Sequence, residues 1–165
     1  MSVELTIWGL VVLSLLVGSV AGTFLTFSDF VMRSLLAARA EVGAEAMAVL
    51  NRVIFRSIFI PLLIGLIPVT ALVGAYALYA LTGWVAWLLA GAGVLYVVGV
   101  FVVSAVGNIP MNNRLDRLPL GAEAAQAYWP DYVRGWLRWN HIRSAASFGA
   151  AACYTVAAVL LAMEL

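Results

Sequence analysis

The chain has 165 residues, of which 65% are hydrophobic and only 10% are charged, and its net charge is +1. A soluble domain carries about 25% charged residues, so this composition indicates a surface that faces lipid rather than water. The near-neutral charge argues against nucleic acid as a partner, which would require a basic patch. The single cysteine, Cys153, excludes an internal disulfide and a cysteine-based metal cluster.

Four apolar segments are long enough to cross a bilayer as helices, because a hydrocarbon core about 30 Å thick needs roughly 20 apolar residues. They are expected at about residues 5–27, 57–80, 84–107 and 141–163. Only Leu81, Thr82 and Gly83 separate the second span from the third, which predicts an antiparallel hairpin. We therefore predict an all-α fold with one membrane domain over residues 1–165, an up-down four-helix bundle with a short cytoplasmic helical subdomain formed by loops 28–56 and 108–140.

The charge distribution predicts the orientation of the spans. All nine cationic side chains are arginines in these two loops or at their edges: Arg33, Arg39, Arg52, Arg56, Arg114, Arg117, Arg134, Arg138 and Arg143. The opposite side has Glu4 and Glu164 and no cation. Since arginine-rich loops stay in the cytoplasm, we expect a multi-pass protein of the plasma (cytoplasmic) membrane, with both loops inside and both termini outside.

Small residues and prolines predict how the spans pack. Gly18 and Gly22 form a GxxxG pair, a pattern that lets helices approach closely. We expect this pair to pack inside the bundle, although a contact between two copies is the alternative. Pro68 is expected to kink the second span, since it removes one backbone hydrogen bond. Residues 33–56 contain no proline and are expected to continue the first span and turn back near Gly43.

The second loop starts with amides and a guanidinium close to the membrane. These polar residues are Asn108, Asn112, Asn113 and Arg114. One interpretation is helix termination, which Gly107, Asn108 and Pro110 favour. The other is recognition of the polar end of a ligand by the amides and the guanidinium that follow.

An aromatic stripe precedes the fourth span. Trp129, Tyr132, Trp136 and Trp139 are spaced by 3, 4 and 3 residues, which puts their rings on one face of a helix. Asn140 and Arg143 fall on the same face if the helix is unbroken. The alternative is an amphipathic helix at the membrane interface, where Trp and Tyr are common.

His141 is the only histidine. In a continuous helix it points about 140° away from Trp136. It could share a pocket with the aromatic stripe only if the helix breaks at Asn140, which is a plausible N-cap for the last span.

Two motifs now suggest a family. The Gly107–Asp116 run and the Trp136–Arg143 segment, with the Gly22–Phe30 run of the first span, resemble the anthrone oxygenase-like family of integral membrane proteins, also described as a domain of unknown function. The resemblance extends over essentially the whole chain. Fungal members oxidise anthrones to anthraquinones without a metal or flavin, and many bacterial members have no known reaction.

The resemblance implies a membrane-embedded, cofactor-independent monooxygenase that oxidises a small planar aromatic or phenolic substrate with O2. An enolate intermediate would need a base and stabilisation of its oxygen. His141 is the natural base, while Arg143 and Asn140 would stabilise the oxygen. The expected substrate-binding residues are Asn108, Asn112, Asn113, Arg114, Trp136 and Trp139. No cofactor and no metal site is expected.

The same polar cluster also fits a protein of another class. The alternative is a non-catalytic membrane subunit, or a small-ligand binding protein in which His141 could hold a haem. The expected partners are the lipid bilayer, a small apolar aromatic substrate with O2, and a homo-oligomer or membrane complex. Catalysis would require His141, whereas a binding role would tolerate Gln there.

Overall fold

The computed structural model describes residues 3–119 and 121–164, and this part of the chain is helical with no strand. Four helices are long and apolar enough to cross a membrane: Val3–Ala37, Phe59–Ala80, Gly83–Arg117 and Glu123–Ala162. The all-α prediction with four spans is confirmed, and the chain is a multi-pass membrane protein.

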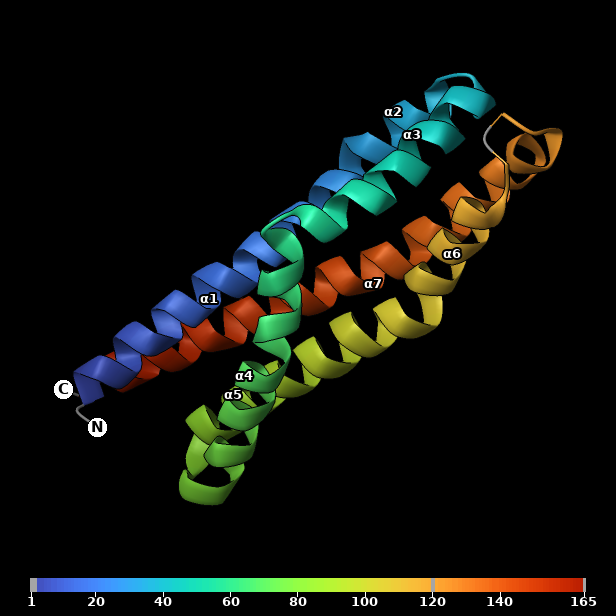
Figure 1. Ribbon diagram of the computed structural model, residues 1–165. Coiled ribbons are helices and arrows are strands. Elements are labelled where there is room, and N and C mark those ends of the chain that lie inside the picture. Colours follow the sequence, from blue (N-terminus) through green and yellow to red (C-terminus); the bar gives the residue numbers. More distant parts are fainter. Residues whose placement is uncertain (1–2, 120, 165) are drawn as a thin grey trace.

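Two of the four long helices contain π-helical turns. The first comprises α1 (Val3–Thr26), the π-helix η1 (Phe27–Val31) and α2 (Met32–Ala37). The third comprises α5 (Gly83–Tyr96), the π-helices η3 (Val97–Val102) and η4 (Ser104–Asn108), and α6 (Ile109–Arg117). The remaining elements are α3 (Ala40–Val53), the short 3₁₀-helix η2 (Ile54–Arg56), α4 (Phe59–Ala80) and α7 (Glu123–Ala162) (Figure 1).

The helical subdomain is built by helices that continue beyond the expected spans. α7 has 40 residues, or about 60 Å at 1.5 Å per residue, which is twice a hydrocarbon core of about 30 Å. The third helix likewise does not end at Gly107 or Asn108 but continues to Arg117. Pro110 is accommodated in the first turn of α6, directly after the π-helical turn η4.

The first loop turns earlier than expected. The chain reverses at Ala38 and Arg39, between α2 and α3, and not near Gly43. Gly43 lies inside α3, where a Cβ atom would collide with the carbonyl oxygen of Leu35 and meet the ring of Trp129. The glycine at this position serves close packing of helices and not a turn.

α1 and α7 lie side by side along most of their length, and α5 packs against α7 (Figure 1). α4 forms the predicted hairpin with α5 but touches α1 only briefly. In the described part of the chain, no Cα atom of α4 comes within 8 Å of α7, η4 or α6. α4 therefore does not pack closely against the second half of the third long helix.

Two hydrophobic clusters hold the helices together. The membrane-level cluster is centred on Val17, Val20, Tyr96, Ala150 and Tyr154. The cluster of the subdomain consists of Met32, Ala44, Met47, Leu115, Trp129, Tyr132, Val133 and Trp136. The expected internal contact of Gly18 and Gly22 is wrong, since a Cβ on either would have no other part of the described chain within 4 Å.

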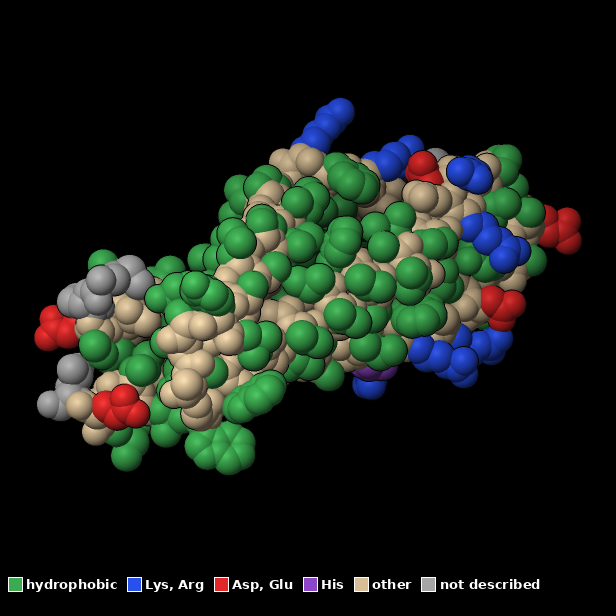
Figure 2. All heavy atoms as spheres, turned by 90° about the horizontal axis from the view of Figure 1, so that it is seen from below, with side chains coloured by type: hydrophobic (Ala, Val, Ile, Leu, Met, Phe, Trp, Pro, Cys, Tyr) green, Lys and Arg blue, Asp and Glu red, His purple; other side chains and the backbone are tan. Residues whose placement is uncertain are grey.

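Charge and aromatic side chains mark the two ends of the molecule. Figure 2 shows the Arg side chains of the visible face over the half opposite the termini, with hydrophobic side chains over much of the rest of that face. The exposed Trp and Tyr side chains of the described residues lie in the helix ends away from the arginines: Trp8, Tyr76, Tyr79, Trp84 and Trp87. Aromatic belts of this kind lie at membrane interfaces. By the positive-inside rule we propose that the Arg-rich end is cytoplasmic.

Candidate functional site

A cavity of about 470 Å³ lies between α1, α3, α4 and the third long helix. Trp136 and Arg143 of α7 also line it. Its volume falls within the roughly 300–1,000 Å³ of small-molecule sites. The protein therefore has a cavity that can hold a whole organic ligand at the junction of the two hydrophobic clusters.

Two sets of side chains stand out in the lining of the cavity, one apolar and one polar, and we call them the apolar wall and the polar wall. The apolar wall comes from η2 and α4: Ile54, Phe55, Phe59, Ile60, Leu63, Ile64 and Ile67. The polar wall comes from η4 and α6: Ser104, Asn108, Asn112, Asn113 and Asp116. Four of these five are spaced by four residues and share one helix face. We name Ser104, Asn108, Asn112 and Asp116 the polar stripe.

Arg143 lies next to Ser104, at the end of the polar stripe that we call its inner end. Its side chain is buried, with 7% exposure. Its Nη2 donates a hydrogen bond to Asn140 Oδ1 at 2.6 Å, and its Nη1 donates to Ser104 Oγ at 3.3 Å. The guanidinium carbon lies 4.2 Å from the centroid of the Phe24 ring and 5.2 Å from that of a Trp136 ring. No carboxylate within the described ranges forms an ion pair with it. A buried charge without a counter-ion is costly.

Asn140 holds this guanidinium from a fully buried position. Its Nδ2 donates to the Phe24 carbonyl oxygen and to Ser28 Oγ, both at 2.7 Å. A carbonyl oxygen can only accept, which fixes the orientation of the amide. Oδ1 therefore faces Arg143 as an acceptor.

Asn108 is 1% exposed and is fixed in the same way. Its Nδ2 donates to the Trp136 carbonyl oxygen at 3.1 Å, which leaves Oδ1 as a buried acceptor without a partner. Arg143 Nε is likewise a buried donor without a partner. Each such group costs about 1–3 kcal/mol if it stays unpaired. Both residues line the cavity, and a ligand that reached these buried atoms with a donor and an acceptor would satisfy both.

Asn112 positions the aromatic part of the site. Its Oδ1 accepts hydrogen bonds from Tyr132 Oη at 2.8 Å and from Trp136 Nε1 at 2.9 Å. Tyr132 Oη accepts a long hydrogen bond of 3.5 Å from Asn51 Nδ2. These bonds join α3, α6 and α7 and fix the Trp136 ring beside Arg143.

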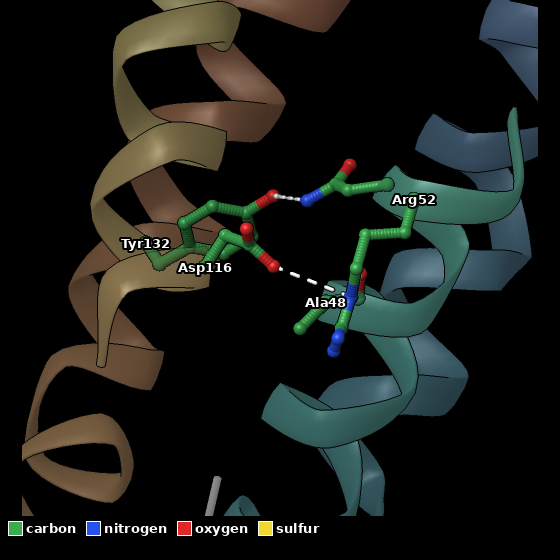
Figure 3. A network of polar contacts seen from close by, with 5 residues as sticks. Ala48, Arg52, Asp116 and Tyr132 are labelled. Atoms are coloured by element: carbon green, nitrogen blue, oxygen red, sulfur yellow. Dashed lines mark hydrogen bonds and ion pairs between the residues drawn. The ribbon is translucent and has the colours of Figure 1, made fainter. Parts of the chain in front are cut away.

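A second bridge joins α3 to α6 at the outer end of the polar stripe. Arg52 Nε lies 3.3 Å from Asp116 Oδ1 and donates to the Ala48 carbonyl oxygen at 3.2 Å. Figure 3 shows Arg52 on one side of this bridge, with Asp116 and Tyr132 facing it from the other. Both charged side chains are about half exposed, so this end of the cavity borders on water.

The structure brings together five of the predicted site residues: Asn108, Asn112, Trp136, Asn140 and Arg143. The predicted face of α7 is confirmed, since the helix is unbroken and this face is buried. The other three predicted substrate-binding residues lie apart from this cluster. Asn113 lines the cavity but is exposed, Arg114 lies over the Tyr128 ring at 4.1 Å, and Trp139 packs on Gly107.

His141 does not join the cluster. It is exposed, and it is absent from the described residues that line the cavity. The helix break that would have turned it inwards does not occur, because α7 runs through Asn140 without interruption. The Asn140 side chain bonds to other helices and therefore does not cap the last span.

Sequence reasoning missed Phe24, Ser28, Asn51 and Ser104. Ser104 could have been found, since it lies four residues before Asn108 and extends the polar stripe. Phe24 and Ser28 carry no signal of their own, because their role depends on the register between α1 and α7. Within the described ranges, no group of three or more His, Cys, Asp or Glu side chains comes together as a metal site.

Comparison with known proteins identifies the family. The family model described as anthrone oxygenase matches residues 52–153. No curated protein and no solved structure matches the chain. The matched region includes the polar stripe, Trp136, Asn140 and Arg143, and covers more than half of the sequence. The chain therefore belongs to the anthrone oxygenase family.

Proposed function

We propose that this protein binds a small, planar, ionisable aromatic molecule in the cavity and promotes its oxidation by O2. The observation that carries the proposal is the buried Arg143 guanidinium, which has no carboxylate counter-ion in the described chain and an unpartnered Nε. An ionisable residue at membrane depth is a functional-site candidate. An enolate or phenolate would supply the missing negative charge.

The cavity offers matching contacts for such a ligand. The oxyanion would accept a hydrogen bond from Arg143 Nε, and a neighbouring hydroxyl would donate to Asn108 Oδ1. The rings would lie against Trp136 and the aliphatic side chains of α4. Aromatic surface packs favourably against such walls, and the amides of Asn108 and Asn112 are held by bonds that a ligand need not break.

The chemistry requires stabilisation of charge more than a reactive side chain. In an anthrone, a C–H bond opposite the carbonyl breaks, its electron pair delocalises to form the enolate oxygen, and the proton passes to water. Asp116, the one carboxylate among the described lining residues, lies where that water meets the cavity and can accept the proton. The enolate then reduces O2. One oxygen atom becomes the new carbonyl, and the other leaves as water with the two hydrogens of the methylene group.

Arg143 acts in this scheme as an oxyanion donor. A fixed donor in a water-poor site is typically worth about 10²–10³ in turnover. The bonds to Asn140 and Ser104 fix the guanidinium before the charge develops, so little reorganisation is needed during the reaction.

A ligand-binding protein without catalysis is the second candidate. It is favoured by the lining of the cavity, whose described residues include no His or Cys and whose carboxylate is paired with Arg52. Such a site would bind an anionic aromatic molecule and leave it unchanged. His141, being exposed, is not placed to hold a haem in this cavity.

The test is oxygen uptake with anthrone. Protein in lipid nanodiscs should consume O2 and form anthraquinone, seen by absorption, faster than protein-free nanodiscs. Arg143→Gln should lower turnover by about 10²–10³. Arg138→Gln, an exposed arginine on the same helix, should retain it. Anthrone binding without turnover would support the ligand-binding protein, and neither binding nor turnover would contradict both candidates.

A further inference from the structure

The cavity is not enclosed on the side where α4 stands apart from the third long helix. α4 approaches neither η4 nor α6 in the described structure. The edges of this gap are apolar and exposed: Phe55 and Ile64 on one side, Phe101 and Ile109 on the other, with 73%, 56%, 47% and 46% exposure. All four also line the cavity. We name this opening the lateral slot.

The end of the cavity nearest to water is bridged. The Arg52–Asp116 ion pair and the Asn51–Tyr132 hydrogen bond connect α3 to α6 there, as Figure 3 shows for Arg52 and Asp116. The side chains of the neighbouring subdomain cluster are buried, and Leu115 among them is 2% exposed. A ligand coming from water would have to separate these contacts, whereas the lateral slot has no polar contact across it in the described residues.

We propose that the lateral slot is the portal through which the substrate passes between the bilayer and the cavity. The substrate is then a membrane-dissolved amphiphile, an apolar ring system with one hydroxylated, ionisable edge. The ionisable edge rests on the proposed function, and the route rests on the slot. An apolar molecule that moves from lipid to the slot never exposes its rings to water, which would cost about 25 cal/mol per Å².

The two walls of the cavity specify how this amphiphile enters. The polar stripe faces the apolar wall of α4 across the cavity. A planar molecule can therefore slide in with its hydroxylated edge along the stripe and its apolar edge along α4. Arg143 lies at the inner end of this path, where the unpaired guanidinium draws the ionised edge inwards. Polar selectivity and access from lipid are thus combined in one cavity.

The experiment measures binding rates of 1,8-dihydroxyanthraquinone to the full chain in nanodiscs, followed by the change in its visible absorption as it ionises. Ile64→Trp and Ile109→Trp narrow the slot from its two sides. Val69→Trp on α4 and Val106→Trp on η4 are matched controls, since both positions are exposed and neither lines the cavity.

The slot variants should slow association and dissociation alike, each by about tenfold, so that the two rates change more than the equilibrium constant does. A portal is crossed in both directions, so its narrowing acts on both rates, whereas the loss of an apolar contact in the cavity acts mainly on dissociation. The control variants should keep both rates. The association rate of the wild type should rise with the ratio of probe to lipid, because the protein takes the probe from the bilayer.

Arg52→Gln separates this route from access through water. It removes the Asp116 ion pair and should leave both rates unchanged. Faster binding in Arg52→Gln, with no effect of the slot variants, would overturn the portal. So would a loss of affinity at unchanged association rate, which would show that Ile64 and Ile109 contact the bound ligand without controlling its entry. If the wild type fails to bind the probe, the proposed function falls and the portal falls with it. Binding with rates that no slot variant alters refutes the portal alone.

Discussion

Asn140 Oδ1 accepts a hydrogen bond of 2.6 Å from Nη2 of Arg143, one turn further along α7. The same amide is anchored to α1 through the Phe24 carbonyl oxygen and Ser28 Oγ. One asparagine thus fixes both the packing of α1 on α7 and the direction of the buried guanidinium. The site is therefore a product of the helix packing and not of a mobile loop.

Asn140→Ala should destabilise the protein by about 2–4 kcal/mol, because it leaves buried partners in α1 and α7 without hydrogen bonds. Asn113→Ala is the matched control, since Asn113 is exposed and its replacement should change stability by less than about 0.5 kcal/mol. Thermal or denaturant unfolding in detergent micelles measures both. Equal stability of the two variants would show that Asn140 does not connect the helices.

Arg143→Met should abolish binding of an anionic aromatic molecule while the fold is retained. The change removes a costly buried charge that has no counter-ion, and against this gain it leaves Asn140 Oδ1 without its partner, a loss of about 1–3 kcal/mol. Unfolding and absorption titration with 1,8-dihydroxyanthraquinone test the two halves of this prediction. A large loss of stability, with binding retained, would identify Arg143 as a structural residue. Arg138→Met, at an exposed position, should leave binding unchanged.

Asp116→Asn should lower anthrone turnover by at least about 10², the lower bound for the loss of a general base. The amide keeps the size of the carboxylate but cannot accept a proton. Asp131→Asn is the control, because Asp131 forms an exposed ion pair with Arg134 outside the cavity. Oxygen uptake under saturating anthrone gives the comparison. Equal turnover in the two variants would rule out Asp116 as the proton acceptor.

His141→Ala should keep most of the activity and fall well short of the 10²–10⁴-fold loss expected for a base. The imidazole is exposed and outside the cavity lining. Turnover of anthrone by the purified variant decides the matter. A loss as large as that of Arg143→Gln would mean that α7 rearranges during the reaction and brings His141 inwards.

Gly107→Ala should destabilise the protein by about 1–3 kcal/mol, the usual cost of overpacking. A Cβ at this position would overlap the indole ring of Trp139. Gly91→Ala, earlier in the same long helix, has no neighbour within 4 Å and should be neutral or stabilising by up to about 1 kcal/mol. The unfolding midpoint of Gly107→Ala in micelles should therefore lie clearly below that of Gly91→Ala. A neutral Gly107→Ala would argue against this helix contact.

The spans and the buried face of α7 could be predicted because both depend on local patterns. About 20 apolar residues define a span, and the spacing from Trp129 to Arg143 defines a face. The helix ends could not be predicted, since Asn108, Pro110 and Asn140 are typical of helix termini. Here the amides of Asn108 and Asn140 bond to other helices, and a π-helical turn precedes Pro110. Local propensity was overridden by tertiary contacts.

The central residue of the site illustrates the same limit, since the sequence favours His141 and the structure favours Arg143. Residue chemistry alone favours the histidine, because it is the side chain best suited to proton transfer near neutral pH. Geometry favours the arginine, which is buried, unpaired and adjacent to the cavity. Phe24 and Ser28 complete its surroundings from another helix, and no sequence pattern connects them to residue 140 or 143.

The most direct test of the central claim is an experimental structure of the protein with bound 1,8-dihydroxyanthraquinone. The account predicts the ligand in the 470 Å³ cavity, with one oxygen within hydrogen-bonding distance of Arg143 Nε and a hydroxyl on Asn108 Oδ1. Its rings should lie between Trp136 and α4. A ligand bound elsewhere, or one in the cavity with no oxygen near Arg143, would contradict the account.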